Sequence, residues 1–236
     1  MADPLGAEER EQFLAILTDG SDGELASLTS LCRRLLKLLP HLGASLALMN
    51  QGAGQGLAGA FGDFASAAQD LEFVLGEGPG IRAYSDGRPI VVDDVRIADE
   101  RWPLFGYRAV EIGLRSVCAL PLQVGSVRLG VLCLFGDSPE AMTPEDFTSA
   151  VLVADLVTHL VLVYQSEASS ESLPGALERS DFRAIVHQAT GMISAQLDCG
   201  VGEALVLLRG RAFAADRSID EVAEELVMGR TRLDGR

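Results

Sequence analysis

The 236-residue chain is long enough for one large domain with a small one, or for two medium domains. Its apolar content of 48% and charged content of 22% are ordinary for globular proteins and argue against wholesale disorder. A net charge of −15 does not suit non-specific binding of nucleic-acid phosphates by the whole surface, because such binding needs clustered cations.

The charge is distributed unevenly along the chain. Residues 1–173 carry a net charge of −13, whereas residues 174–236, with 8 Arg against 10 acidic residues, carry −2. Any nucleic-acid role is therefore expected in the C-terminal part. No run approaches the ~20 apolar residues that span a bilayer. The N-terminal MADPLGAEEREQF lacks the basic and apolar regions of a signal peptide, so we expect a cytoplasmic protein with no membrane partner.

The four cysteines lie far apart, with no CxxC pair and no histidine cluster beside them. Zinc and redox motifs both need close spacing, so the pattern favours buried, reduced cysteines and predicts no metal or cofactor site. They are Cys32, Cys118, Cys133 and Cys199.

The first half of the chain alternates helical and strand-like patterns. Helical spacing predicts a helix over 24–39, and two short apolar runs flank the turn QGAGQG and predict a hairpin over 44–61. A helix over 64–75 is followed by the breaker GEGPG at 76–80. After it we expect a short helix over 81–87, a strand over 89–95, a helix over 101–114, and a β-hairpin of 115–124 and 126–135 joined through Gly125.

A long helix is predicted over 143–165, with Thr143 as N-cap and Pro144 at its first position. Its apolar residues cover two sides, which indicates burial on both sides: against its own sheet and against a partner subunit. The alternative is an internal helix of a larger core. The stripe that we assign to a homodimer contact is Phe147, Val151, Ala154, Thr158 and Val161.

These patterns predict an α+β fold with a mostly antiparallel sheet, followed by three helices. The polar stretch SEASSESLPG is the best linker candidate. We therefore divide the chain into an acidic N-terminal segment (1–23), an α+β domain (24–165), a linker (166–177), a helical domain (178–229) and a tail (230–236).

The first of the three helices has a core stripe, a polar stripe and a stripe of small residues. Arg183, His187 and Thr190 lie on the polar stripe, and Gly191 lies on the small one, where it costs roughly 1 kcal/mol relative to Ala. Close approach of another backbone would compensate for this cost. Gly200 is expected to end the helix as its C′ residue. A second helix over 202–215 displays two arginines, and SIDE at 218–221 is a capping box that opens the third.

The motifs QATGMI, EALVLLRGRAF and IDEVAEELV resemble the ANTAR domain, a three-helix RNA-binding module of bacterial transcription antiterminators. This resemblance covers about residues 178–229 and implies binding of paired stem-loops in leader RNA. Thr190 stands where that family commonly has Lys or another long polar residue. The RNA-binding candidates are Arg183, His187, Thr190, Gly191, Arg209, Arg211 and Arg230.

The stretches LGEGPGIRAYSDGRPIVVDDV, DERWPLF and GLRSVCALPLQVGSVRLGVLCLF resemble the GAF domain of actinobacterial proteins that join GAF to ANTAR. The resemblance implies an antiparallel sheet flanked by helices and a pocket for a small-molecule ligand, whose identity it does not give. Aromatic residues suit such a pocket, although ordinary core packing explains them too. The candidates are Phe73, Tyr84, Trp102, Phe105 and Tyr107.

No catalytic constellation is apparent, so we expect a regulator and not an enzyme. GQGLAG (54–59) fits a dinucleotide fingerprint, but a strand and not a helix follows it, which favours a hairpin turn. The acidic pair Asp93 and Asp94 is better explained as loop charge than as an acid/base site. The leading hypothesis is an RNA-binding antiterminator with a ligand-sensing domain. The alternative is a ligand-binding protein whose C-terminal helices serve dimerisation or protein docking.

Overall fold

The computed structural model describes residues 15, 32, 33, 35–37, 43–50, 54–97, 101–140, 142–167 and 181–231. At 49, 50, 54–58, 163–167 and 181–183 it describes the backbone alone. The predicted N-terminal segment 1–23 and most of the predicted linker and tail therefore lie outside the described residues. Within the predicted helix 24–39, the described residues 32, 33 and 35–37 are helical.

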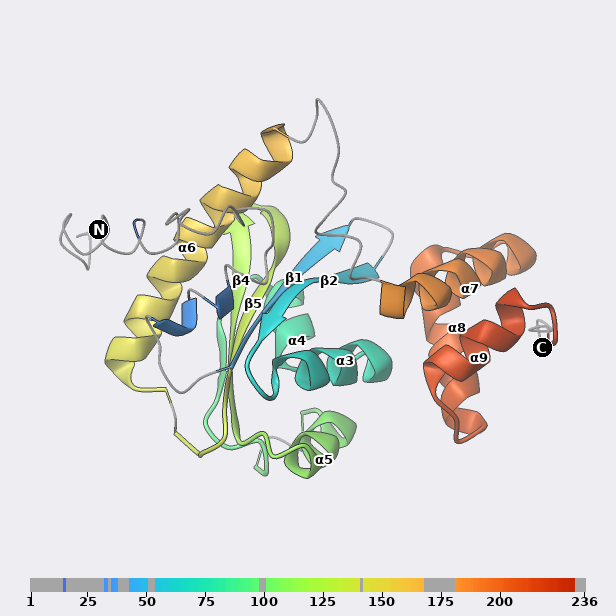
Figure 1. The fold of residues 1–236 in the computed structure, drawn as a ribbon, viewed down its shortest axis with the longest axis horizontal. Coiled ribbons are helices and arrows are strands. Elements are labelled where there is room, and N and C mark those ends of the chain that lie inside the picture. The colour runs from blue at the N-terminus through green and yellow to red at the C-terminus, as the bar shows by residue number, and fades with distance from the viewer. Residues whose placement is uncertain are drawn as a thin grey trace.

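The described chain forms a five-stranded antiparallel sheet in the order β2-β1-β5-β4-β3 (Figure 1). The strands are β1 (Gly43–Asn50), β2 (Gly54–Phe61), β3 (Ile90–Val92), β4 (Ser116–Val124) and β5 (Val127–Gly136). Both predicted hairpins are present, and the second turns at Gly125, whose φ of 58° suits glycine. The fold prediction is confirmed: an α+β domain with helices on both faces of its sheet.

Side chains alternate between the two faces of the sheet, as the two-residue period of a strand requires. On β4, Cys118, Leu120 and Leu122 join one core cluster, whereas Val117 and Ala119 join the other. The helix α6 (Pro144–Glu167) covers the first face. The second face is covered by α3 (Ala65–Leu75), α4 (Pro79–Asp86) and α5 (Pro103–Glu111). The sheet thus separates two cores within one domain.

The helix α6 begins as predicted, because Thr143 Oγ1 accepts a hydrogen bond from Asp146 N at 3.1 Å. Its predicted partner-facing stripe is wrong. Ala154 and Val161 are buried in the cluster against the sheet, and Phe147 packs against that cluster. Thr158 is 2% exposed and donates its hydroxyl proton to Ala154 O. Of the five residues, Val151 alone is exposed, because the stripe that looked spare covers the chain's own sheet.

The C-terminal helices α7 (Asp181–Leu197), α8 (Val201–Ala214) and α9 (Ile219–Val227) form a bundle beside α3 (Figure 1). The capping box at Ser218 and Glu221 is present as predicted. The prediction for Gly200 is wrong: α7 ends at Leu197, Asp198 takes the left-handed conformation with φ 51°, and Gly200 is the N-cap of α8. The turn between the two helices is so short that the residue expected to follow the end of α7 is instead the N-cap of α8.

Candidate functional site

Three arginines of the bundle lie close enough to the carboxylate of Glu225 on α9 to act on its charge. Arg217 Nη1 lies 3.0 Å from Glu225 Oε2. That hydrogen bond, and then the charges of Arg217, Arg230 and Arg211, lower the pKa of Glu225. Arg211 and Arg230 are exposed, so the structure brings these two predicted RNA-binding residues to one surface. Arg217 is not among the predicted residues, although its four-residue spacing from Glu221 indicates an ion pair on one side of the helix.

Two other predicted RNA-binding residues lie against α3 of the sheet-containing domain, which the GAF resemblance predicts to be the sensor domain. The guanidinium carbon of Arg209 is 5.4 Å from the centre of the Phe73 ring, and its Nη2 donates a hydrogen bond to Phe73 O. The His187 ring meets the same phenyl ring edge-on, with ring centres 6.0 Å apart. The seven candidates therefore do not form one surface.

Thr190 is the clearest correction among the RNA-binding candidates. Its side chain is 1% exposed, and its hydroxyl donates to Val186 O at 2.6 Å. The predicted polar stripe is thus wrong at this position, because the helix turns Thr190 into the bundle and the hydroxyl is satisfied by its own helix. Gly191 is exposed, and a Cβ there would meet no other residue within 4 Å. The helix α7 includes Arg183, but its side chain lies outside the described residues.

A groove of about 430 Å³ runs between α7 and the end of α9 on the bundle. Its lining mixes apolar side chains with backbone and one amide, and it includes Ala195 from the stripe of small residues. The lining residues are Met192, Ile193, Ala195, Gln196, Leu226, Gly229 and Thr231.

The aromatic residues assigned to a ligand pocket are not gathered around one space. Trp102 and Phe105 are buried in the core between the sheet and α3–α5. Tyr107 is 66% exposed, because it lies on the outer side of α5. Phe73 is buried in the bundle's cluster and not in the sensor core. The fifth pocket candidate, Tyr84, is half-buried. The pocket prediction is therefore wrong for Phe73 and Tyr107.

A buried carboxyl group lies in the sensor core, and the sequence analysis missed it. Glu72 on α3 is 2% exposed, and its Oε1 accepts a hydrogen bond from Gly80 N at 2.7 Å. Burial raises the pKa of Glu72 to about 8, although hydrogen bonds from Gly80 N and Ile81 N oppose that rise. A Cβ at Gly80 would lie 2.4 Å from Glu72 Oε2 and 2.9 Å from Cys133 Sγ. The glycine-rich segment GEGPG thus also binds this carboxyl group and leaves space for it.

A glutamate of that glycine-rich loop, Glu77, holds α5 in place. Glu77 Oε1 accepts hydrogen bonds from Leu104 N at 3.0 Å and Phe105 N at 3.1 Å, at the beginning of that helix. The loop 76–80 therefore ties α3, α4 and α5 together on one face of the sheet.

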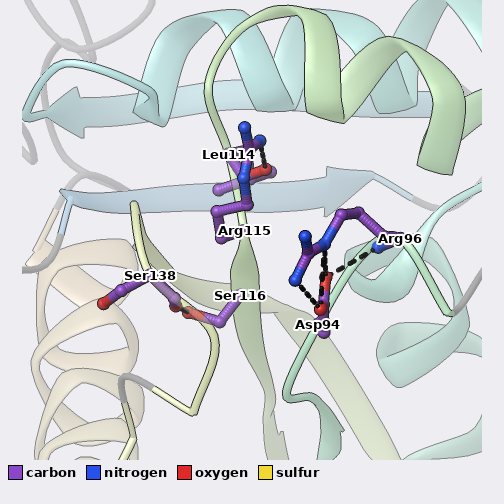
Figure 2. A network of polar contacts seen from close by, with 6 residues as sticks. All are labelled: Asp94, Arg96, Leu114, Arg115, Ser116 and Ser138. Atoms are coloured by element: carbon purple, nitrogen blue, oxygen red, sulfur yellow. Dashed lines mark hydrogen bonds and ion pairs between the residues drawn. The ribbon is translucent and has the colours of Figure 1, made fainter.

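Asp94 was predicted to be a loop charge, and its surroundings fit that prediction. Its carboxylate accepts hydrogen bonds from Arg96 Nε at 2.9 and 3.0 Å (Figure 2). These bonds lower the pKa of Asp94 to about 2. A carboxylate held ionised in this way is a poor general acid near neutral pH. Nearby, Ser116 Oγ donates to Ser138 O at 2.9 Å and fixes the end of the hairpin.

Among the described residues, no group of three or more His, Cys, Asp or Glu side chains could hold a metal ion. No single described helix has the length and apolar composition to cross a membrane, and the pair α7 and α8 passes that test only together, across a bend of 109°.

Solved structures with a similar fold include GAF domains and an enzyme. The GAF domain of a phosphoenolpyruvate-protein phosphotransferase from Coxiella burnetii is 17% identical, with a TM-score of 0.50 over 68% of this chain and 98% of that chain. The corresponding Acinetobacter domain is 11% identical, with a TM-score of 0.49 over 72% and 99%. Free methionine-R-sulfoxide reductase from Neisseria meningitidis is 15% identical, with a TM-score of 0.47 over 67% and 93%. No curated protein matches the chain.

Two family models match in succession along the chain. The GAF-domain model matches residues 26–161, which is more than half of the chain, and the ANTAR-domain model matches residues 176–227. The first contains the sheet and the second contains the bundle. The chain therefore belongs to the GAF-domain family and joins this sensory domain to an ANTAR domain, an RNA-binding regulatory module.

Proposed function

We propose that the protein is a signal-responsive transcription antiterminator. Its ANTAR bundle binds stem-loops in leader RNA and so prevents a terminator from forming, and its GAF domain senses a small-molecule ligand. In this proposal the protein is a regulator and not an enzyme. Homodimer formation stays a prediction, now without the α6 stripe as its surface.

The observation that carries the RNA proposal is the arrangement of basic residues around Glu225 on the bundle. Arg211 and Arg230 are exposed there, and both lie near Glu225 together with Arg217. Guanidinium groups form paired hydrogen bonds with phosphate, and several on one surface can follow an RNA backbone. The rest of the chain carries a strong negative charge, which restricts RNA to this part of the molecule.

The proposal is tested by selecting, with the full chain, RNAs from a pool of paired hairpins with randomised loops. The double variant Arg211→Glu, Arg230→Glu should bind the selected RNA at least about tenfold more weakly, with a smaller dependence on salt. The matched control is Arg82→Glu, Arg108→Glu, which makes the same charge change at two exposed arginines of the GAF domain. Equal weakening by both doubles, or equal binding of scrambled RNA by the wild type, would count against the proposal.

The alternative function is protein docking by the C-terminal helices, and one observation favours it. The core cluster of the bundle already includes Phe73 of the GAF domain in the same chain, and His187 and Arg209 contact that residue. If the bundle served docking alone, the Arg211→Glu, Arg230→Glu double variant would bind hairpin RNA no more weakly than the wild type.

A further inference from the structure

The helix α3 presents consecutive residues to two different domains. Glu72 is buried in the sensor core, where it accepts the hydrogen bond from Gly80 N. Phe73 is 3% exposed and belongs to the bundle's core cluster. Consecutive helical residues point about 100° apart, so a single turn of α3 contacts both cores. A movement of this turn would therefore change contacts in both cores.

The bundle holds this turn of α3 through an arginine and a histidine. The Arg209 guanidinium lies over the Phe73 ring and donates a hydrogen bond to Phe73 O. The His187 ring contacts the same phenyl ring edge-on. Gly76, which ends α3 with φ 70°, leaves room for this arrangement, because a Cβ there would lie 2.8 Å from Arg209 Nη1. Arginine, aromatic ring and C-terminal carbonyl therefore form one compact contact.

The contact removes one edge of the bundle from solvent. Arg209 and His187 are each partly buried by it, whereas Arg211, two residues further along α8, is exposed. The Arg209 guanidinium keeps other N–H donors, but its contacts with Phe73 O and the phenyl ring fix its position and cover one of its faces, so docking limits how it can approach a phosphate.

We propose that the end of α3 masks one edge of the RNA-binding surface, and that RNA and α3 compete for Arg209 and His187. This inference rests on the proposed RNA-binding function. While docked, the full chain offers RNA only the exposed Arg211 side, which binds it weakly. The full surface binds RNA once α3 has moved away. The loop 76–80 is the natural point of control, because the Gly80–Glu72 hydrogen bond fixes the position of the same helical turn.

The size of the contact makes such competition reversible. It includes the Phe73 side chain, the edge-on contact of the His187 ring, one hydrogen bond and one cation–π contact, and it is small beside the buried core of either domain. If docking leaves about one molecule in ten with a free surface, apparent RNA affinity is lowered about tenfold.

The test compares Phe73→Ala with wild type in the full chain, using the RNA selected above. Phe73→Ala should bind this RNA about tenfold more tightly, because it removes the ring that holds Arg209 and His187. The matched control is Val74→Ala on the same helix, where the side chain is 38% exposed, and it should bind like wild type.

A second measurement needs no variant. Hydrogen exchange of wild-type amides at 71–77 should become faster when the RNA is added, because RNA displaces the bundle from α3. Ordinary binding at this site would slow the same amides.

The outcomes separate the two proposals. If the wild type and a folded Phe73→Ala bind RNA equally, or if RNA leaves exchange at 71–77 unchanged or slower, masking is wrong while RNA binding stands. If neither protein binds any hairpin RNA, the proposed function fails and masking fails with it. Binding by Phe73→Ala alone supports both.

Discussion

A glycine of the GAF sheet, Gly130, and three glycines of the ANTAR bundle occupy opposite surroundings. In the sheet, a Cβ at Gly130 would lie 2.1 Å from Ala47 O, so the paired strands themselves exclude a side chain. In the bundle, a Cβ at Gly191, Gly202 or Gly210 would meet no other residue within 4 Å. Gly130 of the sheet is thus explained by the chain's own packing. The three glycines of the bundle are not, and they fit a surface that another molecule approaches.

The largest expected effect is at Gly130. Gly130→Ala should lower the free energy of unfolding by more than about 4 kcal/mol, because the methyl group would displace the β1 backbone. Urea unfolding of the full chain measures this. Gly210→Ala is the matched control in the bundle and should not destabilise. A mild effect at Gly130 would mean that the two strands separate easily. Close packing would then not explain why a glycine stands at this position.

The next effect concerns Glu72, which fills the space that Gly80 leaves. Its pKa is raised from 4.5 to about 8 in the folded protein. Between these values the unfolded carboxyl ionises while the folded one keeps its proton, so wild-type stability falls as pH rises, by up to about 1.4 kcal/mol per pH unit. Glu72→Gln keeps an acceptor for Gly80 N and should be more stable than wild type by about 3 kcal/mol at pH 8.

Unfolding of both proteins in urea at pH 5, 6, 7 and 8 gives the two stability profiles. Glu111→Gln is the control, since Glu111 is exposed and pairs with Arg108 at the surface. Parallel profiles for wild type and Glu72→Gln would show that the carboxyl is ionised in the folded protein.

The smallest effect is at Gly191. Gly191→Ala should raise the free energy of unfolding by roughly 1 kcal/mol, because Ala favours the helix interior and has open space there. If this face meets RNA, the same variant should bind the selected RNA more weakly although it is more stable. Undiminished binding would remove this face from the RNA surface, and lower stability would reveal a contact within the chain.

Most of the fold could be predicted because it depends on local signals. Capping residues, turns and the two periodicities placed the helices and strands from residue 43 to residue 229 close to their observed bounds. The capping box at Ser218 and the hairpin at Gly125 are examples. Apart from the helix end expected at Gly200, the failures were in which element covers a given face. The α6 stripe faces the sheet, and Thr190 faces the bundle, because apolar periodicity reports that a face is buried but not by what.

The candidate site was predicted less well for the same reason. Arg211 and Arg230 lie on one exposed surface, as a basic C-terminal part suggests, but Arg209 is committed to Phe73. No local signal distinguishes Arg209 from Arg211, since both are arginines on the same helix. Glu72 was missed because an acidic residue on a surface-like helix gives no sign that a glycine loop will enclose it.

The sequence by itself determined the order of the elements, their caps and the difference in charge between the two parts, since each depends on neighbouring residues or on composition. Tertiary structure alone decided that α3 lies between two cores, with Glu72 in one and Phe73 in the other. The physical reason is that helical periodicity specifies which residues share a face, whereas the partner of that face comes from residues far along the chain.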